Sequence, residues 1–253
     1  CPAAPPISSS PKGHRPMADT WVCLVTYNEA ANLPLVLEAV RVALPEAGII
    51  VVDDNSPDGT ASLARERAAR DPGIHVIVRE GKLGYASAQR AAIDFAVAQG
   101  AARVVTMDAD LSHDPAALTA LVAALNDADM AIGSRYVPGG ATVGWPVHRQ
   151  LLSRLGNLAF RWIGGLPARD NTSGYRAYRT EAIERLDLAS VPGRGYALLT
   201  QTLVRAQRLG LRIAEVPITF TERRHGHSKM SSAIIGEQLR LLGRLAWQRV
   251  RRG

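Results

Sequence analysis

The sequence predicts an α/β fold in which a mostly parallel central sheet carries helices on both faces within a single domain. Three observations support this prediction. Five apolar runs of strand length alternate with segments of helical spacing, polar and acidic residues follow the runs, and the chain of 253 residues has a usual length for one such domain. Because parallel strands need crossover connections, which are usually helices, this regular alternation is typical of the fold class.

The five apolar runs have the composition of strands that are buried on both faces, since each is nearly continuous and most are rich in Val and Ile. They are WVCLVT, GIIVVDD, IHVIV, RVVTMD and DMAIGS, at residues 21–26, 48–54, 74–78, 103–108 and 129–134. The segments between them have helical spacing and cover residues 29–44, 58–70, 84–99 and 114–125. Asp58 suits the N-cap of the second helix. Residues 145–222 add helices and two short strand candidates, TSGYRAY and LRIAEVPITF, that could wall one side of a site.

The domain limits follow from shifts in composition. Residues 1–19 are rich in Pro and Ser without periodicity, which predicts a disordered leader. Residues 20–230 hold the folded domain, and residues 231–253 are expected to form a basic amphipathic C-terminal helix. Two cysteines are too few for a disulfide framework, and a reducing compartment fits them best. No apolar stretch reaches the roughly 18 residues that a membrane-spanning helix needs.

The positive charge is concentrated at one end of the chain. Residues 223–253 carry eight Lys and Arg and one acid, Glu237, which together account for the whole net charge of +7. A nucleic-acid-binding protein more often spreads its cations over a broad face with aromatic residues between them, so we expect no nucleic-acid partner.

The terminal segment has helical spacing. An apolar stripe is formed by Ile235, Leu239, Leu242 and Ala246. The opposite face holds Glu237, Arg240, Arg244, Gln248 and Arg251. Two interpretations remain open: a helix docked on the core with one solvated face, and a helix lying on an anionic membrane surface.

Ligands of parallel α/β sheets bind beyond the carboxyl ends of the strands. There, VVTMDADLSHDP places Asp108 and Asp110 two residues apart after a buried strand. Two carboxylates held together repel each other unless a cation lies between them. A hard divalent ion such as Mg²⁺ takes one or two carboxylates and completes its shell with phosphate oxygens and water. Asp108 and Asp110 are therefore candidate metal ligands.

Other strand ends supply further candidate residues. VVDDNSPDGT has two adjacent aspartates, one more than a turn needs, so one of them could accept hydrogen bonds from a nucleotide base. TYNEAANLP places Glu29 and Asn32 at the start of the first helix. Cations that suit phosphate are Arg135 in GSRYVPGG and Arg223, Arg224 and Lys229 in RRHGHSKM.

Several common sites are excluded by their missing motifs. The sequence has neither the phosphate-binding loop G-x-x-x-x-G-K-[ST] nor G-x-G-x-x-G after a strand, which argues against a P-loop enzyme and against a dinucleotide oxidoreductase. No Cys and His residues have zinc-site spacing.

From Trp21 to about Ile235 the chain resembles the polyprenol (dolichol) monophosphate mannose synthases of glycosyltransferase family 2. The matching stretches are TYNEAANLP, VVDDNSPDGT, GKLGYASAQ, MDADLSHDP, GSRYVPGG, RDNTSGYRAY and EVPITFTERRHGHSKM. The resemblance implies a GT-A nucleotide-sugar fold and transfer of mannose from GDP-mannose to a polyprenyl phosphate lipid. It also implies dependence on Mg²⁺ or Mn²⁺, inversion at the anomeric carbon, and work at the cytosolic face of a membrane.

The resemblance also implies roles for individual residues. Asp108 and Asp110 match the metal and diphosphate motif, with Ala109 between them near the nucleotide. Positions that match nucleotide binding are Tyr27, Glu29, Val52 and Asp54. Positions near the sugar diphosphate and the acceptor phosphate are Arg135, Arg223 and Lys229. On this basis the expected catalytic residues are Asp110, Arg135 and Arg223.

The chain departs from the family pattern at two places. Ser112 stands where some relatives have a Gln that serves as a further metal ligand, and Ser reaches less far. Gln201, after Leu198, Leu199 and Thr200, stands where relatives carry an acid. Some relatives carry membrane-spanning segments after the catalytic domain, whereas no apolar stretch of this sequence is long enough to be one. We therefore expect this chain to be cytoplasmic and peripheral on the cytosolic face, with an integral membrane anchor protein as a further candidate partner.

Three other interpretations remain. The same fold could use UDP-glucose or UDP-N-acetylglucosamine as donor to polyprenyl phosphate. A polysaccharide synthase would use a sugar hydroxyl as acceptor and would need a general base, for which Glu215 is the candidate. A polyprenyl phosphate is already an anion and needs no base. The third interpretation is a binding module without catalysis.

Overall fold

The computed structural model describes residues 18–192, 195, 197–222 and 232–251. A seven-stranded sheet has the strand order β3-β2-β1-β4-β7-β5-β8. Its strands are β1 (Thr20–Thr26), β2 (Gly48–Asp53), β3 (Ile74–Val78), β4 (Arg103–Asp108), β5 (Met130–Ser134), β7 (Arg176–Arg179) and β8 (Ile213–Pro217). Two short strands, β6 (Ala141–Val143) and β9 (Thr219–Thr221), pair in parallel beside it. All five predicted strands are confirmed.

Strand β7 makes the sheet mixed. It lies between β4 and β5 and runs antiparallel to both. The sequence places a strand here only as part of a wall beside the site. The structure puts it inside the sheet, so β5 does not pair with β4.

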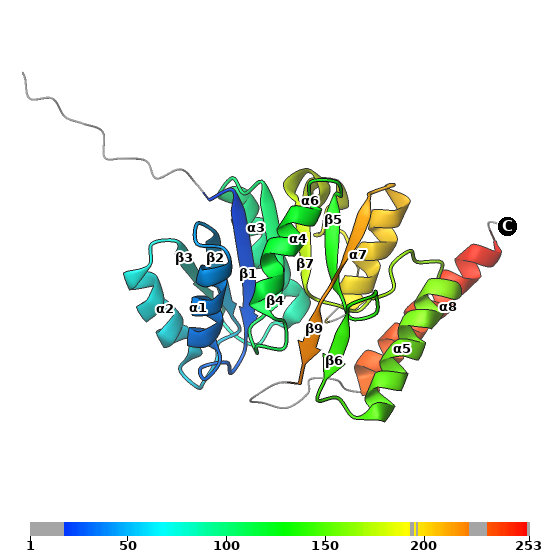
Figure 1. Ribbon diagram of the computed structural model, residues 1–253, viewed down its shortest axis with the longest axis horizontal. Helices are drawn as coiled ribbons and strands as arrows, with labels where there is room; N and C mark the ends of the chain where they lie inside the picture. The colour runs from blue at the N-terminus through cyan, green and yellow to red at the C-terminus, as the bar shows by residue number, and fades with distance from the viewer. Residues whose placement is uncertain (1–17, 193–194, 196, 223–231, 252–253) are drawn as a thin grey trace, which may run out of the picture.

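The helices pack on both faces of the sheet, as predicted (Figure 1). They are α1 (Leu33–Ala43), α2 (Thr60–Arg70), α3 (Tyr85–Ala98), α4 (Leu118–Ala124), α5 (Val147–Trp162), α6 (Thr180–Leu186), α7 (Ala197–Arg208) and α8 (Ser232–Val250), with a 3₁₀ turn η1 at Pro115–Ala117. Apolar residues of α3, α6 and α7 pack against one face of the sheet, and those of α1 and α4 pack against the other. The hydrophobic core therefore lies in two layers, one on each side of the sheet.

The first two helices begin later than the sequence predicts. The first starts at Leu33, because Glu29–Asn32 forms a turn in which the Glu29 carbonyl accepts the N–H groups of Asn32 and Leu33. The second starts at Thr60 after Gly59, whose φ is 89°. Asp58 still serves the helix start from one position earlier, since its carboxylate accepts the Thr60 N–H at 3.1 Å.

The parallel strands end at one edge of the sheet, the lower edge in Figure 1. The register shows this directly, since Val25 of β1 pairs with Asp108 of β4, and Thr26 pairs with Asp53 of β2. At the other half of the sheet, Ser134 of β5 pairs with Pro217 of β8. The loops after these strands consequently meet at the same edge.

Helix α8 is docked on the domain, but by a face that is rotated from the predicted one. Leu241 and Leu245 are buried in a small cluster with Phe160, Leu166 and Val204. Leu239, which the predicted stripe includes, is 63% exposed. The other side of α8 keeps Arg240 and Arg244 exposed, as predicted.

Two further expectations concern the ends of the chain. Nearly all of the predicted leader, residues 1–17, lies outside the described residues, so its disorder stays a prediction. Among the helices that the structure describes, none is both long enough and apolar enough to cross a membrane.

Gly48 gives a test of the sheet packing. A Cβ atom there would lie 2.4 Å from ring atoms of Trp21, so we expect Gly48→Ala to lower the free energy of unfolding by about 1–3 kcal/mol. Gly81→Ala, where a Cβ meets no atom within 4 Å, is the control and should change it by less than about 0.5 kcal/mol. Urea denaturation measures both, and equal stabilities would contradict the tight packing of Trp21.

Candidate functional site

The loop after β4 carries the two aspartates that the sequence singles out. Asp110 is buried, and one of its carboxylate oxygens accepts the Ser112 N–H at 3.1 Å and the Ser112 Oγ at 2.5 Å. Asp108 is more accessible, with 22% of its side chain exposed. Between them, Ala109 is buried. Ser112 therefore orients the Asp110 carboxylate.

His113 holds the backbone at the start of this loop by a hydrogen bond. Its Nδ1 accepts the backbone N–H of Asp108 at 3.1 Å, which leaves the proton on Nε2 when the ring is neutral. The ring stacks on Tyr175 with centroids 4.8 Å apart and meets Phe220 edge-on at 5.3 Å. Burial lowers the pKa of His113 and outweighs the opposite effect of the carboxylates of Asp108 and Asp110. A neutral imidazole thus holds the backbone beside the aspartates.

Asp108 and Asp110 fit a divalent metal ion of the Mg²⁺ or Mn²⁺ type. Both donors are carboxylate oxygens, which such ions prefer. Within the described part of the chain, no third His, Cys, Asp or Glu joins them in a ligand cluster. A site with two protein carboxylates leaves the remaining coordination positions to phosphate and water, as is usual for Mg²⁺ beside a bound nucleotide.

The loop after β2 uses its two aspartates in different ways. Asp53 is fully buried and accepts hydrogen bonds from Thr26 Oγ1 and from the N–H and Oγ of Ser56. Asp54 pairs with Arg79, and its other oxygen accepts the Gly84 N–H at 2.9 Å. Asp53 therefore shapes the turn, whereas Asp54 joins the loops that follow β2 and β3.

The remaining positions proposed for nucleotide binding differ in accessibility. Tyr27 is partly exposed, and the Lys82 ammonium lies 3.9 Å from the centre of its ring. Glu29 is buried, and one of its carboxylate oxygens accepts Asn32 Nδ2 at 2.8 Å. Val52 is fully buried in the core cluster of the α3 face. The Val52 side chain is therefore enclosed by the core, and the match of this position to nucleotide binding stays a prediction.

Arg135 and Asp170 form the main charged pair on the other side of the edge. Nε and Nη2 of Arg135 each donate to a separate Asp170 oxygen at 2.7 Å, and the Arg135 backbone N–H donates to Asp170 at 3.1 Å. Both residues are buried. Burial alone would raise the pKa of Asp170, but Arg135 outweighs it and lowers that pKa. Arg135 is thus tied into the fold through two of its three side-chain nitrogens.

Glu215, the candidate general base, has a structural role here. Its two carboxylate oxygens accept the backbone N–H groups of Arg169 and Asp170 at 2.8 and 3.0 Å. It therefore fixes the segment that carries Asp170.

The three cations predicted in RRHGHSKM, at Arg223, Arg224 and Lys229, lie outside the described residues. Their expected roles stay predictions. Of the other candidates, the register and loops bring Tyr27, Asp54, Asp108 and Asp110 to the same edge of the sheet.

Sequence reasoning missed several residues that build the site. Gly174 is one, because a Cβ there would lie 2.8 Å from Tyr85 Oη and 3.7 Å from Asp108 Oδ1. Asp170 and His113 are others. No local pattern points to Asp170, whose partner is 35 residues away in the chain. His113 had a signal, since it stands three residues after Asp110 in the same acidic stretch, MDADLSHDP.

The comparison with family models matches residues 21–187 to glycosyl transferase family 2. The chain belongs to that family. Its fold is accordingly the GT-A fold that the sequence predicted, and the protein is a glycosyltransferase.

Curated relatives cover most of this family member. Undecaprenyl-phosphate mannosyltransferase of Micrococcus luteus is 47% identical over 212 residues, which is 84% of this chain and 87% of that protein. Polyprenol monophosphomannose synthase of Mycolicibacterium smegmatis is 46% identical, covering 89% and 86%. A dolichol-phosphate mannosyltransferase of Pyrococcus furiosus is 37% identical over 88% of this chain and 62% of its own.

Solved structures share the fold at low identity. A mannosyltransferase from Pyrobaculum calidifontis in complex with GDP-Man and Mn²⁺ has a TM-score of 0.60 and 20% identity, covering 93% of this chain and 64% of that one. Glucosyl-3-phosphoglycerate synthase from Mycobacterium tuberculosis, with Mn²⁺ and UDP, has a TM-score of 0.61 and 23% identity, covering 94% and 86%.

Asp170→Asn tests the buried pair. The change leaves the Arg135 guanidinium buried without its counter-ion, so we expect the free energy of unfolding to fall by about 3–5 kcal/mol. Asp127→Asn, at an exposed position, is the matched control and should stay within about 0.5 kcal/mol of the unchanged protein.

A double variant, Arg135→Met with Asp170→Leu, should lose less stability than Asp170→Asn, because it buries no lone charge. Urea denaturation compares all three. A loss for Asp170→Asn no larger than that of the control would show that the pair does not hold the two segments together.

Proposed function

We propose that this chain transfers mannose from GDP-mannose to a polyprenyl phosphate, with inversion at the anomeric carbon, giving polyprenyl phosphate mannose. The observation that carries the proposal is the pair Asp108 and Asp110 at the carboxyl end of β4. It occurs in a chain that is 46–47% identical to relatives named for mannosyl transfer to such lipids. The GDP-Man and Mn²⁺ bound to a mannosyltransferase of the same fold support the choice of donor.

In this proposal Asp108 and Asp110 hold Mg²⁺ or Mn²⁺. The ion, when bound, neutralises the charge that develops on the departing diphosphate. Ser112 keeps one Asp110 oxygen in place, and the His113 ring holds the Asp108 backbone. Such supporting contacts orient the direct ligands.

The acceptor phosphate is already ionised and attacks without a general base. Its oxygen forms a bond to the anomeric carbon, the bond from that carbon to the β-phosphate oxygen breaks, and GDP leaves with the electron pair. No proton is transferred. Attack from the side opposite the leaving group inverts the anomeric carbon. The engagement of both Glu215 oxygens with backbone N–H groups agrees with a reaction that uses no base there.

The remaining candidate residues bind or position the two substrates. Tyr27, Glu29 and Asp54 lie in the loops after β1 and β2 and are proposed to contact the nucleotide, with Ala109 beside it. Arg135, Arg223 and Lys229 are proposed to balance the phosphate charges. Their catalytic contribution is positioning and charge stabilisation.

We further propose that the protein works on the cytosolic face of a membrane as a peripheral enzyme. Its acceptor is a lipid, and exposed basic and apolar side chains lie together on α8, including Leu239, Arg240 and Trp247. An integral membrane anchor protein is a further proposed partner, and nucleic acid is not.

Asp110→Asn tests the metal and the transfer reaction together. Loss of one electrostatic partner of the transition state should lower kcat by about 10²–10³-fold, because the carboxylate that faces the cation becomes neutral. Asp114→Asn is the control, since Asp114 caps η1 through the Ala116 N–H and an Asn can accept the same bond. Transfer of radiolabelled mannose from GDP-mannose to a short polyprenyl phosphate, extracted into organic solvent, is the measurement. Unchanged turnover of Asp110→Asn would refute the metal assignment.

Thermal stabilisation distinguishes the donors. With Mn²⁺ present, GDP at about 100 times its Kd should stabilise the protein by about 2.7 kcal/mol, whereas UDP at the same concentration should stabilise it less. Asp110→Asn should lose the Mn²⁺-dependent part of the shift. A larger shift with UDP would favour the alternative donors, UDP-glucose and UDP-N-acetylglucosamine.

Ser112→Ala tests how Asp110 is oriented. We expect about 10–100-fold weaker Mn²⁺ affinity in the presence of GDP, because the hydroxyl that holds the carboxylate is lost. Ser112→Thr keeps a hydroxyl and is the conservative comparison. Mn²⁺ titration followed by electron paramagnetic resonance gives both affinities, and equal values for Ser112→Ala and the unchanged protein would contradict this role.

A further inference from the structure

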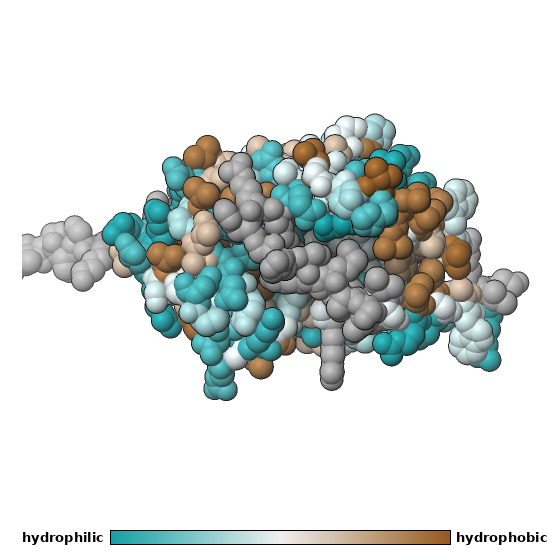
Figure 2. Space-filling view, turned by 90° about the horizontal axis from the view of Figure 1, so that it is seen from below, coloured by the Kyte–Doolittle hydropathy of each residue, from teal (hydrophilic) through white to brown (hydrophobic). Residues whose placement is uncertain are grey.

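Helix α5 has an exposed apolar face that no described part of the chain covers. Its residues recur at helical spacing and are all at least half exposed: Val147, Leu151, Leu155, Leu158 and Trp162. Leu152 and Ile163 widen it, and Leu239 and Trp247 continue the apolar surface on α8. Figure 2 shows hydrophobic side chains gathered at the end of the molecule where α5 and α8 lie. Soluble domains rarely leave so large an apolar patch without a binding role.

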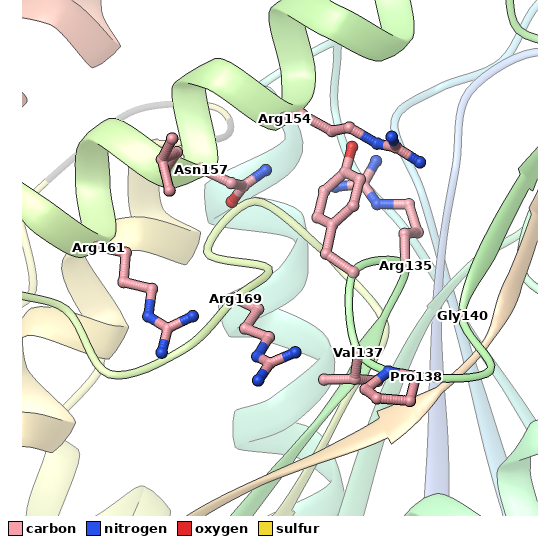
Figure 3. Close-up of a pocket in the computed structure, with 10 residues that line it drawn as sticks. Arg135, Val137, Pro138, Gly140, Arg154, Asn157, Arg161 and Arg169 are labelled. Atoms are coloured by element: carbon pink, nitrogen blue, oxygen red, sulfur yellow. The ribbon is translucent and has the colours of Figure 1, made fainter.

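A basic pocket of about 470 Å³ opens beside this face. It lies between α5 and the loop after β5, and three of its lining residues are Arg154, Arg161 and Arg169 (Figure 3). Arg161 and Arg169 stand together on one side of the pocket, and Arg154 lies at the other end near Arg135. Leu158 lines the pocket and also belongs to the apolar face. Pocket and face are therefore continuous.

The pairing of these three arginines distinguishes them from Arg135. Across the residues that the structure describes, none of their guanidinium groups has a carboxylate partner; Arg161 only lies near the Trp162 ring, at 5.9 Å from its centre. Arg135 differs, since it forms an ion pair with Asp170. Three guanidinium groups around one cavity, with no carboxylate partner among the described residues, make a site for an anion, and their planar donors match phosphate oxygens.

The pocket is separate from the two aspartates that are proposed to bind the metal. Neither Asp108 nor Asp110 lines it, nor does any residue of the loops after β1 and β2. On α5, Arg149 pairs with Glu222 and Ser153 bonds to Tyr136 Oη, on a different side of the helix from Arg154 and Arg161. Arg135 also lines the pocket, beside Arg154 at one end, and it is proposed to balance phosphate charges in the transfer reaction. Arg161 and Arg169 stand at the other end, so an anion held there is distinct from the diphosphate that the aspartates would serve.

The combination of a phosphate-type pocket with an adjoining apolar face matches one kind of ligand surface. A helix at a bilayer interface buries its apolar face among the upper acyl chains, while arginines at its border reach the lipid phosphates. We propose that α5 is the principal membrane-contact helix and that Arg154, Arg161 and Arg169 bind the phosphate of an anionic bilayer phospholipid, which is not consumed. The site goes beyond the proposed transfer reaction and would hold the active-site edge at the membrane surface.

The test uses vesicles of phosphatidylcholine, with and without phosphatidylglycerol, and flotation of the full chain. A triple variant changes Arg154, Arg161 and Arg169 to Gln. Because each arginine near an anionic surface contributes about 1 kcal/mol, binding to the phosphatidylglycerol vesicles should weaken about 100-fold. The matched control changes Arg65, Arg67 and Arg70 of α2 to Gln, which removes the same charge from the opposite end of the molecule. It should weaken binding less than tenfold.

A second pair of variants tests the apolar face. Leu151→Ser with Leu155→Ser should lower binding to both kinds of vesicle, including at high salt, where charge contributions are screened. In the unchanged protein, lipids with brominated acyl chains should quench the fluorescence of Trp162. The Trp162→Phe variant identifies that part of the signal. Circular dichroism and melting temperature check that each variant is folded.

The outcomes separate the possible ligands. Equal vesicle binding by the two triple variants would overturn the proposal. Retained vesicle binding, together with lost turnover of a short polyprenyl phosphate in detergent, would assign the pocket to the acceptor and also overturn it. Full displacement from vesicles by inorganic phosphate at matched ionic strength would mean a free-phosphate site instead. Lost vesicle binding with unchanged turnover in detergent supports the proposal, and the flotation result decides it even if the chain transfers a different sugar.

Discussion

The buried pair between Arg135 and Asp170 is the constraint on which much of the site depends. It joins the loop after β5 to the segment before β7 through two side-chain hydrogen bonds and one backbone hydrogen bond. Glu215 on β8 holds the same segment by its backbone. The segment continues to Gly174, which lies beside Tyr85 and Asp108. A charge pair on one half of the sheet thereby fixes backbone next to Asp108, one of the two aspartates proposed to bind the metal, on the other half.

The two halves of the edge carry opposite charges, and this division suits the proposed reaction between two anionic substrates. The loop after β4 carries Asp108 and Asp110, and this pair of carboxylates needs a cation before a diphosphate can approach. The loop after β5 and helix α5 present guanidinium groups. Between them stand rings that are neutral or apolar, namely His113, Tyr175, Phe220 and Trp145. Burial lowers the pKa of His113, so that this layer adds no charge of its own.

The sequence predicted well those features that depend on residues close together in the chain, such as strands and the residues that follow them. Nearly continuous apolar runs marked five strands. The rule that ligands bind beyond the carboxyl ends of parallel strands correctly placed Asp108 and Asp110 at that edge of the sheet. Strand β7 was harder, because RAYR holds two arginines and only two apolar residues, and its antiparallel pairing depends on partners far away in the chain. The Asp170 partner of Arg135 and the Arg79 partner of Asp54 are likewise long-range contacts.

Local patterns also failed to predict which face of a helix is buried. The apolar stripe expected on α8 assumed that the helix turns its most hydrophobic side to the core, yet Leu239 is exposed and Leu241 is buried. Neighbouring helices decide which side is covered, since Phe160 of α5 and Val204 of α7 form the cluster. On α5, apolar residues recur at the spacing that suggests a core-facing stripe, yet the structure places them on the exposed face of the helix.

The position of β7 also bears on how the chain reaches its native state. During synthesis, β1 to β4 with their helices can assemble as the polypeptide leaves the ribosome, because each strand pairs with one already made. Strand β5 emerges next but has no neighbour until β7 follows more than forty residues later and β8 later still. The backbone hydrogen-bonding groups of β5 have no partner strand until β7 and β8 have been synthesised. This stage is therefore the one at which misassembly and binding by chaperones are most favoured.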